Sequence, residues 1–137
     1  MLKKYERLSS HVTIKDILKA KTAISTYIHR TNLIYYSELS RIIGCDAFVK
    51  HENHLPTGSF KIRGALNFFQ TIPKEDVANG VLVSTRGNHG LAMAWAGQWF
   101  HTPCTVLVQE NYNPVFNRII EIFGADLIVH GHLFYDA

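Results

Sequence analysis

GVLVSTRGNHGLAMAWAGQWFHTPCTVLV, from Gly80 to Val108, is the stretch that decides the fold. It contains two apolar, valine-rich runs of strand length, at 81–84 and 104–108. Between them a helix is predicted over 89–100, with alanine and glycine on all of its sides. A helix that lacks a polar face is expected to pack closely on both sides. The stretch therefore predicts a strand, a helix and a second strand.

The same alternation continues after this stretch. Asn113 and Pro114 are typical N-cap and N1 residues of a helix, and Gly124 is placed to end that helix. A third apolar run follows at 127–129. Strands that alternate with helices predict a parallel sheet with right-handed crossovers. A nucleotide-binding Rossmann domain is the obvious alternative, but no GxGxxG follows any of the strands.

Shorter elements are expected before residue 79. Thr13 and Asp16 are placed for the capping box of a helix that runs to about Lys21. The remaining expected elements are an extended segment at 31–36, a helix that Ser37 caps and Gly44 ends, a strand at 47–50, a helix at about 60–70 and a short helix that starts at Pro73.

Two glycine-bearing turns carry the residues of chemical interest. PTGSFKIRGA, Pro56–Ala65, places Lys61 where a polar turn leads into a helix, and an amine there can be desolvated and made nucleophilic. STRGNHG, Ser84–Gly90, leads into the next predicted helix, whose free N–H groups suit an anion. An amine and an anion site together suit a cofactor with an aldehyde and an anionic substrate. Either turn taken alone is more often a solvated lysine or an ordinary turn.

Three motifs together resemble one family. They are KHEN at 50–53, PTGSFK-x-R-G-A-x-N ending at Asn67, and GNHG at 87–90. They are similar to motifs of the serine/threonine dehydratases, pyridoxal-phosphate enzymes of fold type II that include threonine ammonia-lyase and serine racemase. The resemblance implies an α/β fold with a three-layer parallel sheet like that of the tryptophan synthase β subunit, here truncated. It assigns 1–78 to an incomplete large cofactor-binding domain and 79–137 to most of the small domain.

The resemblance also implies roles for individual residues. Lys61 matches the catalytic lysine that forms a Schiff base with pyridoxal phosphate and later moves the substrate's α-proton. Phe60 would pack against the cofactor, and Asn88 would bond to the cofactor's phenolic oxygen. Thr85, Asn88 and His89 match the turn that binds the carboxylate of the amino acid substrate.

Arg86 departs from the family pattern, in which many members carry a serine. In serine racemase that hydroxyl is the acid and base on the cofactor face opposite the lysine. An arginine cannot act as a neutral proton shuttle, so racemisation is disfavoured. Arg86 can instead contact a second carboxylate or other anion on the substrate, or simply face solvent. Three nearby residues are expected to have structural roles. Ser59 supplies a turn hydroxyl, Arg63 forms an ion pair or a surface charge on the helix, and Glu52 is a structural acid.

The reaction implied by the resemblance is β-elimination from serine, threonine or a related amino acid, which gives a 2-oxo acid and ammonia. Family members are more than twice as long, are commonly homo-oligomers, and bind the cofactor phosphate with a glycine-rich loop in their C-terminal half. None of the nine glycines here forms such a run. We therefore expect an N-terminal fragment that binds the cofactor weakly and exposes apolar surface. An inactive fragment, or an interaction module that pairs with full-length relatives, is the alternative.

Composition excludes several other classes. The 137 residues are 47% hydrophobic, and their net charge of +3 is too small and scattered for nucleic-acid binding. No apolar run is long enough to span a membrane, and the N-terminus lacks a signal peptide's hydrophobic region, so a cytoplasmic location is expected. Cys45 and Cys104 are expected to be reduced, and the eight histidines show no HxxxH or HExxH metal pattern.

Overall fold

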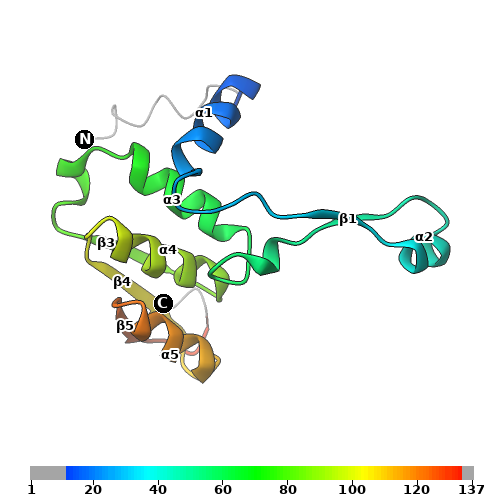
Figure 1. Ribbon diagram of the computed structural model, residues 1–137. Helices are drawn as coiled ribbons and strands as arrows, with labels where there is room; N and C mark the ends of the chain where they lie inside the picture. Colours follow the sequence, from blue (N-terminus) through cyan, green and yellow to red (C-terminus); the bar gives the residue numbers. More distant parts are fainter. Residues whose placement is uncertain (1–11, 134–137) are drawn as a thin grey trace.

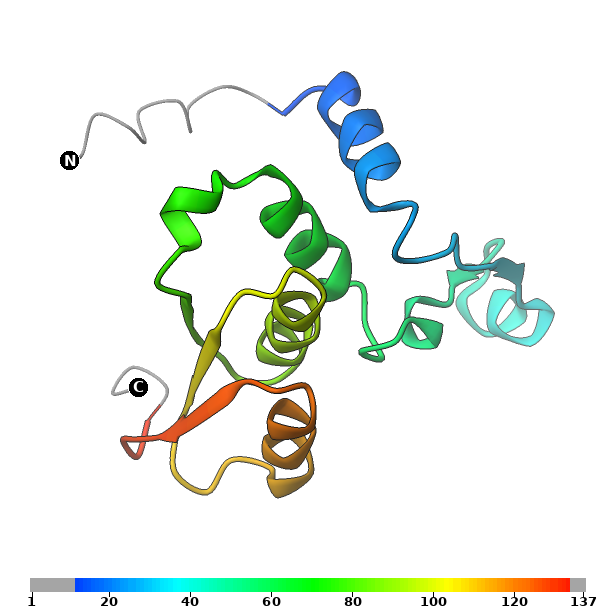
Figure 2. The same ribbon diagram turned by 60° about the vertical axis from the view of Figure 1, so that its left-hand side comes forward.

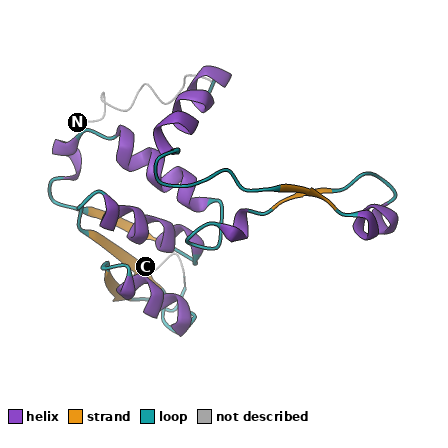
Figure 3. Ribbon diagram, in the orientation of Figure 1, coloured by secondary structure: helices purple, strands orange, loops and turns teal. Residues whose placement is uncertain are grey.

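The computed structural model describes residues 12–133, which form a packed body and an arm that extends away from it (Figure 1, Figure 3). The arm consists of β1, α2 and β2, and the other elements form the body. In chain order the elements are α1 (Ile14–Ile24), β1 (Leu33–Tyr35), α2 (Ser37–Ile43), β2 (Phe48–Lys50), the short η2 (Glu52–His54), α3 (Lys61–Thr71), the short η3 (Lys74–Val77), β3 (Val81–Ser84), α4 (Asn88–Trp99), β4 (Cys104–Val108), α5 (Pro114–Ile122) and β5 (Asp126–Val129).

A three-stranded parallel sheet in the order β3–β4–β5 supports the body. Val83 lies opposite Val106, and Val106 lies opposite Leu127, so apolar side chains align across the sheet. Helices α4 and α5 cover the same face of the sheet, as right-handed crossovers require (Figure 2). The predicted alternation of strands and helices is confirmed, with β5 starting at Asp126, one residue earlier than expected. The opposite face is more open, and Leu82 on it is 68% exposed.

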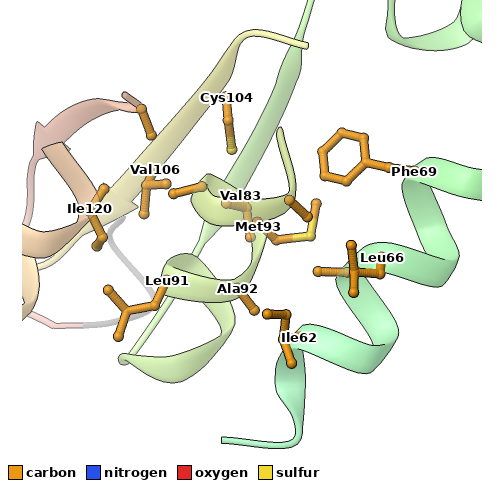
Figure 4. Close-up of a cluster of buried hydrophobic side chains, with 14 of the residues drawn as sticks. Ile62, Leu66, Phe69, Val83, Leu91, Ala92, Met93, Cys104, Val106 and Ile120 are labelled. Atoms are coloured by element: carbon orange, nitrogen blue, oxygen red, sulfur yellow. The ribbon is translucent and has the colours of Figure 1, made fainter. Parts of the chain in front are cut away.

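The hydrophobic core lies largely between α3, α4 and the sheet (Figure 4). Ile62 and Leu66 of α3 are completely buried and point toward α4. Val106 of β4 and Ile120 of α5 are also completely buried. Burying one such side chain contributes about 1.5–3 kcal/mol to folding. The amphipathic face of α3 therefore fixes the position of the helix that begins with Lys61.

Two glycines allow α4 to approach its neighbours closely. A Cβ at Gly90 would lie 2.5 Å from Cγ2 of Thr85 and 2.9 Å from Cγ1 of Val106. A Cβ at Gly97 would lie 3.0 Å from the carbonyl oxygen of Thr102. Residues on several sides of α4 are buried, as the lack of a polar face predicted.

The hydrophobic core contains residues from both sides of position 78, the predicted boundary between the two domains. One cluster joins Ile24, Ile62 and Phe69 with Val83 and Val106. The end of α1 and the whole of α3 therefore pack together with the sheet. The division of the whole protein into a large domain at 1–78 and a small domain at 79–137 stays a prediction.

Helix α1 begins as expected and ends later than expected. The Thr13 hydroxyl accepts the N–H of Asp16, and the Asp16 carboxylate accepts the N–H of Thr13, which confirms the capping box. The helix continues to Ile24 instead of ending near Lys21. Ile14 in the first turn is exposed and Ile24 in the last turn is buried, so the helix reaches the core only at its end.

The arm is an antiparallel ribbon of β1 and β2 with α2 at its tip (Figure 1). Its apolar side chains contact little within the described residues, and Leu33, Ile42 and Phe48 are 58%, 72% and 59% exposed. The prediction that the chain exposes apolar surface is therefore confirmed.

The boundaries of α2 correct one prediction and confirm another. Ser37 is the first residue of the helix and not its N-cap. Tyr36 takes the N-cap position because its N–H bonds to the Ala47 carbonyl oxygen at 2.9 Å, which keeps the chain extended up to that residue. Gly44 ends the helix in the left-handed conformation, with φ of 75°, as predicted.

Candidate active site

Lys61 is the first residue of α3. The chain reaches it through a turn in which the N–H of Gly58 donates to the Leu55 carbonyl oxygen at 2.8 Å, with φ of 67° at Gly58. Phe60 occupies the N-cap position, and its ring centroid lies 5.3 Å from Lys61 Nζ. Both residues are exposed, so residues 12–133 do not supply the burial that was expected around the lysine.

Arg63, one half-turn after Lys61, is anchored by Glu52. Its Nε and Nη2 atoms donate to the two carboxylate oxygens of Glu52 at 2.6 and 2.9 Å. The Thr31 hydroxyl donates to the same carboxylate at 2.6 Å, and Lys50 Nζ lies 3.5 Å from it. The hydrogen bonds from Arg63, followed by that from Thr31, lower the pKa of Glu52 to about 2 despite its partial burial. The ion pair expected for Arg63 is present, with Glu52 as its partner, and the pair holds the start of α3 against the base of the arm.

The turn between β3 and α4 is organised by Thr85. Its side chain is 1% exposed, and its hydroxyl accepts the N–H groups of Gly87 and Gly90, each at 3.0 Å. The same hydroxyl donates to the Gly87 carbonyl oxygen at 3.2 Å. Gly87 has φ of 140°, and a Cβ there would lie 2.7 Å from the hydroxyl oxygen of Tyr112. The turn therefore requires glycine at this position, and the hydroxyl of Thr85 is occupied by the turn's own backbone.

The first turn of α4 presents backbone N–H groups at the end of β3. The N–H groups of Asn88 and His89 lie in the first helical turn and cannot bond within the helix. Together with the helix dipole they favour an anion. Partial burial, and then the positive charge of Lys61, lower the pKa of His89 below its ordinary value, which favours the neutral ring. Asn88 and Arg86 are exposed on the same turn.

A cavity of about 570 Å³ joins the two motifs. Lys61, the first residue of α3, and Phe60 just before it line the cavity, and His89 and Met93 line it from α4. The remaining lining residues are Arg63, Gly64, Ala65, Phe68 and the first three residues of β3. Thr85, Arg86 and Asn88 belong to the adjoining turn and do not line the cavity. The structure thus brings together the lysine and the histidine that lie 28 positions apart in the chain.

Three further hydroxyl groups lie beside these motifs along the chain. The side-chain oxygens of Thr57, Ser59 and Ser84 are buried and have no hydrogen-bond partner within residues 12–133. Thr57 and Ser59 precede Lys61 in the first turn, and Ser84 ends β3. The sequence indicated a turn role for Ser59 and no role for Thr57 or Ser84, because a buried hydroxyl without a partner has no signature in sequence.

In residues 12–133, no helix combines the length and hydropathy needed to cross a membrane. The same part of the chain contains no group of three histidine, cysteine or acidic side chains arranged to hold a metal ion. Cys45 and Cys104 are free thiols, and burial raises the pKa of Cys104 to about 11.

Comparison with known proteins identifies the family. Residues 24–137 match the family described as pyridoxal-phosphate dependent enzyme, and the chain belongs to this family. An L-threonine ammonia-lyase of Thermotoga maritima is 38% identical over 128 residues, which are 92% of this chain and 31% of that relative. The crystal structure of serine racemase from Dictyostelium discoideum superposes with a TM-score of 0.82 at 34% identity and covers 91% of this chain and 41% of that chain. A pyridoxal 5'-phosphate-dependent aspartate racemase superposes with a TM-score of 0.81 at 34% identity, covering 88% of this chain and 38% of that one.

These matches confirm the fold class and the resemblance to serine/threonine dehydratases of fold type II. The cofactor of the family is pyridoxal phosphate. The chain spans about a third of the length of the curated relatives that it matches.

The residues present fit the aldehyde end of this cofactor. An amine and an aromatic ring, from Lys61 and Phe60, line a cavity whose volume is in the usual range for small-molecule sites. Gly64 is the one glycine among the lining residues, so the described part of this cavity does not contain a glycine-rich phosphate cradle. The fit therefore concerns the reactive end of the cofactor and not its phosphate.

Proposed function

We propose that this chain carries the lysine-bearing part of the active site of a pyridoxal-phosphate-dependent amino acid lyase. The reaction is β-elimination, which releases a 2-oxo acid and ammonia from serine, threonine or a related amino acid. The observation that carries the proposal is the cavity shared by Lys61 and His89, because it brings an amine next to the turn that begins α4. A cytoplasmic location and a homo-oligomeric state belong to the same proposal.

Each residue has a task that follows from its position. Lys61 Nζ is the group that would hold the cofactor and then accept the proton from the substrate's α-carbon. The N–H groups of Asn88 and His89, at the positive end of α4, would bind the substrate carboxylate. The Asn88 side chain, exposed on that turn, would reach the cofactor's phenolic oxygen. Thr85 was assigned to the carboxylate as well, and we propose that it acts by holding the turn in shape.

The elimination breaks two bonds of the substrate. The proton on the α-carbon moves to Lys61 Nζ, and the β-substituent departs with the electron pair of its own bond. Pyridoxal phosphate supplies the electron sink that stabilises negative charge at the α-carbon. Water then converts the unsaturated product to a 2-oxo acid and ammonia. The lowered pKa of His89 favours its neutral form, which adds no second positive charge beside the amine that must take up the proton.

Arg86 favours the lyase reaction over racemisation. It is exposed on the turn that binds the carboxylate, at the position where serine racemase carries its second proton donor. A guanidinium stays protonated at ordinary pH and cannot exchange a proton with the opposite face of the substrate. We propose that Arg86 selects substrates with a second anionic group, because its guanidinium carries a positive charge on the turn that begins α4.

The test is an absorbance spectrum of the chain with added pyridoxal phosphate, followed by borohydride reduction and peptide mapping. We expect a weak Schiff-base band, with the reduced label on Lys61 and absent from Lys61→Ala. The matched control is Lys19→Ala, which removes an exposed lysine of α1 and should keep the label on Lys61. Label scattered over many lysines, equal in the parent and in Lys61→Ala, would overturn the proposal.

A second candidate function is an inactive interaction module that pairs with longer relatives. The apolar side chains exposed along the arm favour it. Sedimentation of the chain mixed with a full-length dehydratase would detect the pairing, and Ile42→Asp at the tip of the arm should weaken it. If the two proteins sediment independently at micromolar concentration, this second candidate is wrong.

A further inference from the structure

A second pocket, of about 370 Å³, lies where the end of α1, the loop after it, the end of β2 and α3 meet. Four basic side chains line it: Lys21, Arg30, Lys50 and Arg63. The other lining residues are Ser25 and two isoleucines, Ile24 and Ile28, which are 7% and 5% exposed. The pocket therefore combines apolar lining residues with four basic side chains and has no acidic lining residue.

One carboxylate offsets part of this charge. Glu52 bonds to Arg63 and lies 3.5 Å from Lys50, so four cations face one anion, an excess of three positive charges. Lys50 Nζ also donates to the Thr31 carbonyl oxygen at 2.9 Å, which holds that amine in place. Within the described residues, the side chains of Lys21 and Arg30 form no hydrogen bond or ion pair, and both residues are exposed. Two of the four cations are thus held in place, and two can turn toward a ligand.

Positive charges that converge on a concave surface repel one another and attract a counter-ion. A pocket with low-dielectric walls strengthens this attraction, because fewer water molecules screen it. Guanidinium groups match the geometry of phosphate oxygens, and lysine adds a compact charge. Buried isoleucines beside the cations suit a ligand with an apolar part next to its anionic group. We propose that this pocket binds a small molecule that carries a phosphate group.

The pocket differs from the cavity that Lys61 lines, and Arg63 is the one residue that lines both. Binding here needs neither Lys61 nor the turn before α4. The inference therefore stands apart from the proposed lyase activity, and Lys61→Ala should bind phosphate as the parent does. This separates a failure of the present proposal from a failure of the proposed function.

Titration calorimetry of the chain with inorganic phosphate, at an ionic strength held constant with sodium chloride, tests the proposal. We expect saturable binding of one phosphate. Arg30→Gln and Lys21→Gln should each weaken it about tenfold, the effect of one charge-assisted hydrogen bond worth roughly 1.4 kcal/mol. The matched control is Lys15→Gln, which removes an exposed lysine of the same helix that does not line the pocket. Both substituted residues are exposed, so the variants should keep the far-UV circular dichroism of the parent.

Three results would overturn the proposal. The first is phosphate binding no stronger than the heat of dilution at matched ionic strength. The second is equal affinity in the parent and in the double variant Lys21→Gln, Arg30→Gln. The third is tighter binding of citrate than of phosphate, which would assign the pocket to polycarboxylates. Loss of binding in the double variant, with Lys15→Gln and Lys61→Ala unchanged, is the supporting result.

Discussion

Replacing Glu52 by glutamine should destabilise the protein in a way that depends on pH. The pKa of Glu52 falls from 4.5 to about 2 because Arg63 and Thr31 donate hydrogen bonds to its ionised form. A pKa difference of about 2.5, at roughly 1.4 kcal/mol per pKa unit, corresponds to about 3 kcal/mol. The side chains of Glu52 and Arg63 are 19% and 31% exposed, so solvent screening reduces this to roughly 2 kcal/mol.

The sign of the pH dependence follows from the direction of the pKa change. A carboxylate whose pKa is lowered in the folded state stabilises the protein fully above its unfolded pKa, near 4.5. This stabilisation is lost as the pH falls through the folded-state pKa of about 2, where Glu52 takes up its proton in the folded state too. The difference in free energy of unfolding between the parent and Glu52→Gln should therefore be constant from pH 7 to 5 and shrink between pH 4.5 and 2.

Urea denaturation followed by circular dichroism, at pH 7, 4 and 2.5, measures this difference. The matched control is Glu38→Gln, which breaks the ion pair between Glu38 and Arg41, whose side chains are 79% and 74% exposed. An exposed pair of this kind contributes about 0–1 kcal/mol. Equal destabilisation by both variants at pH 7, or a loss in Glu52→Gln that stays the same down to pH 2.5, would refute the reasoning.

Three other perturbations probe the turn before α4 and the core. Gly87→Ala should lower the free energy of unfolding by about 2 kcal/mol or more, because its Cβ would meet the Tyr112 hydroxyl at a strained φ. Thermal unfolding should show a larger loss of stability than in the control Gly124→Ala, where φ is also positive but no atom lies within 4 Å of the added Cβ. Thr85→Val should lower the free energy of unfolding by about 2 kcal/mol, because it leaves two backbone N–H groups unpaired. Thr85→Ser should lower it less, because it keeps the hydroxyl, and equal losses in the two variants would contradict this. Burial raises the pKa of Cys104 to about 11. At pH 8 a thiol reagent should therefore modify Cys104 at least about tenfold more slowly than the exposed Cys45. Equal rates in the folded protein would show that Cys104 is accessible to the reagent.

Short-range patterns account for the elements that were predicted well. Asn113 caps α5 by accepting the N–H of Val115, and Gly44 ends α2 with a positive φ, both for reasons that concern neighbouring residues only. The alternation of strands and helices after Gly80 allows one handedness of connection, so the sequence also predicted the parallel sheet. The extent of α1 was predicted less well, because the packing of Ile24 into the core continues the helix past Lys21.

The candidate site was predicted as two separate motifs. The residue types at Lys61 and at 87–90 follow from the sequence and from its family, since an amine and a helix start have the same chemistry wherever they lie. Their common cavity could not be deduced from local pattern, because it depends on how α3 packs across α4. The same is true of the carboxylate that holds Arg63, 11 residues away along the chain.

The sequence by itself determined the order of the elements, the parallel sheet and the chemistry available at Lys61 and at the start of α4. These depend on hydrophobic period, caps and glycine, which act over a few residues. Only the tertiary structure decided that α3 joins the sheet in one core, that the arm extends with its apolar side chains exposed, and that four basic residues from α1, its following loop, β2 and α3 surround one pocket. Such contacts join residues distant in the chain, and their energies depend on burial and distance, which no local pattern contains.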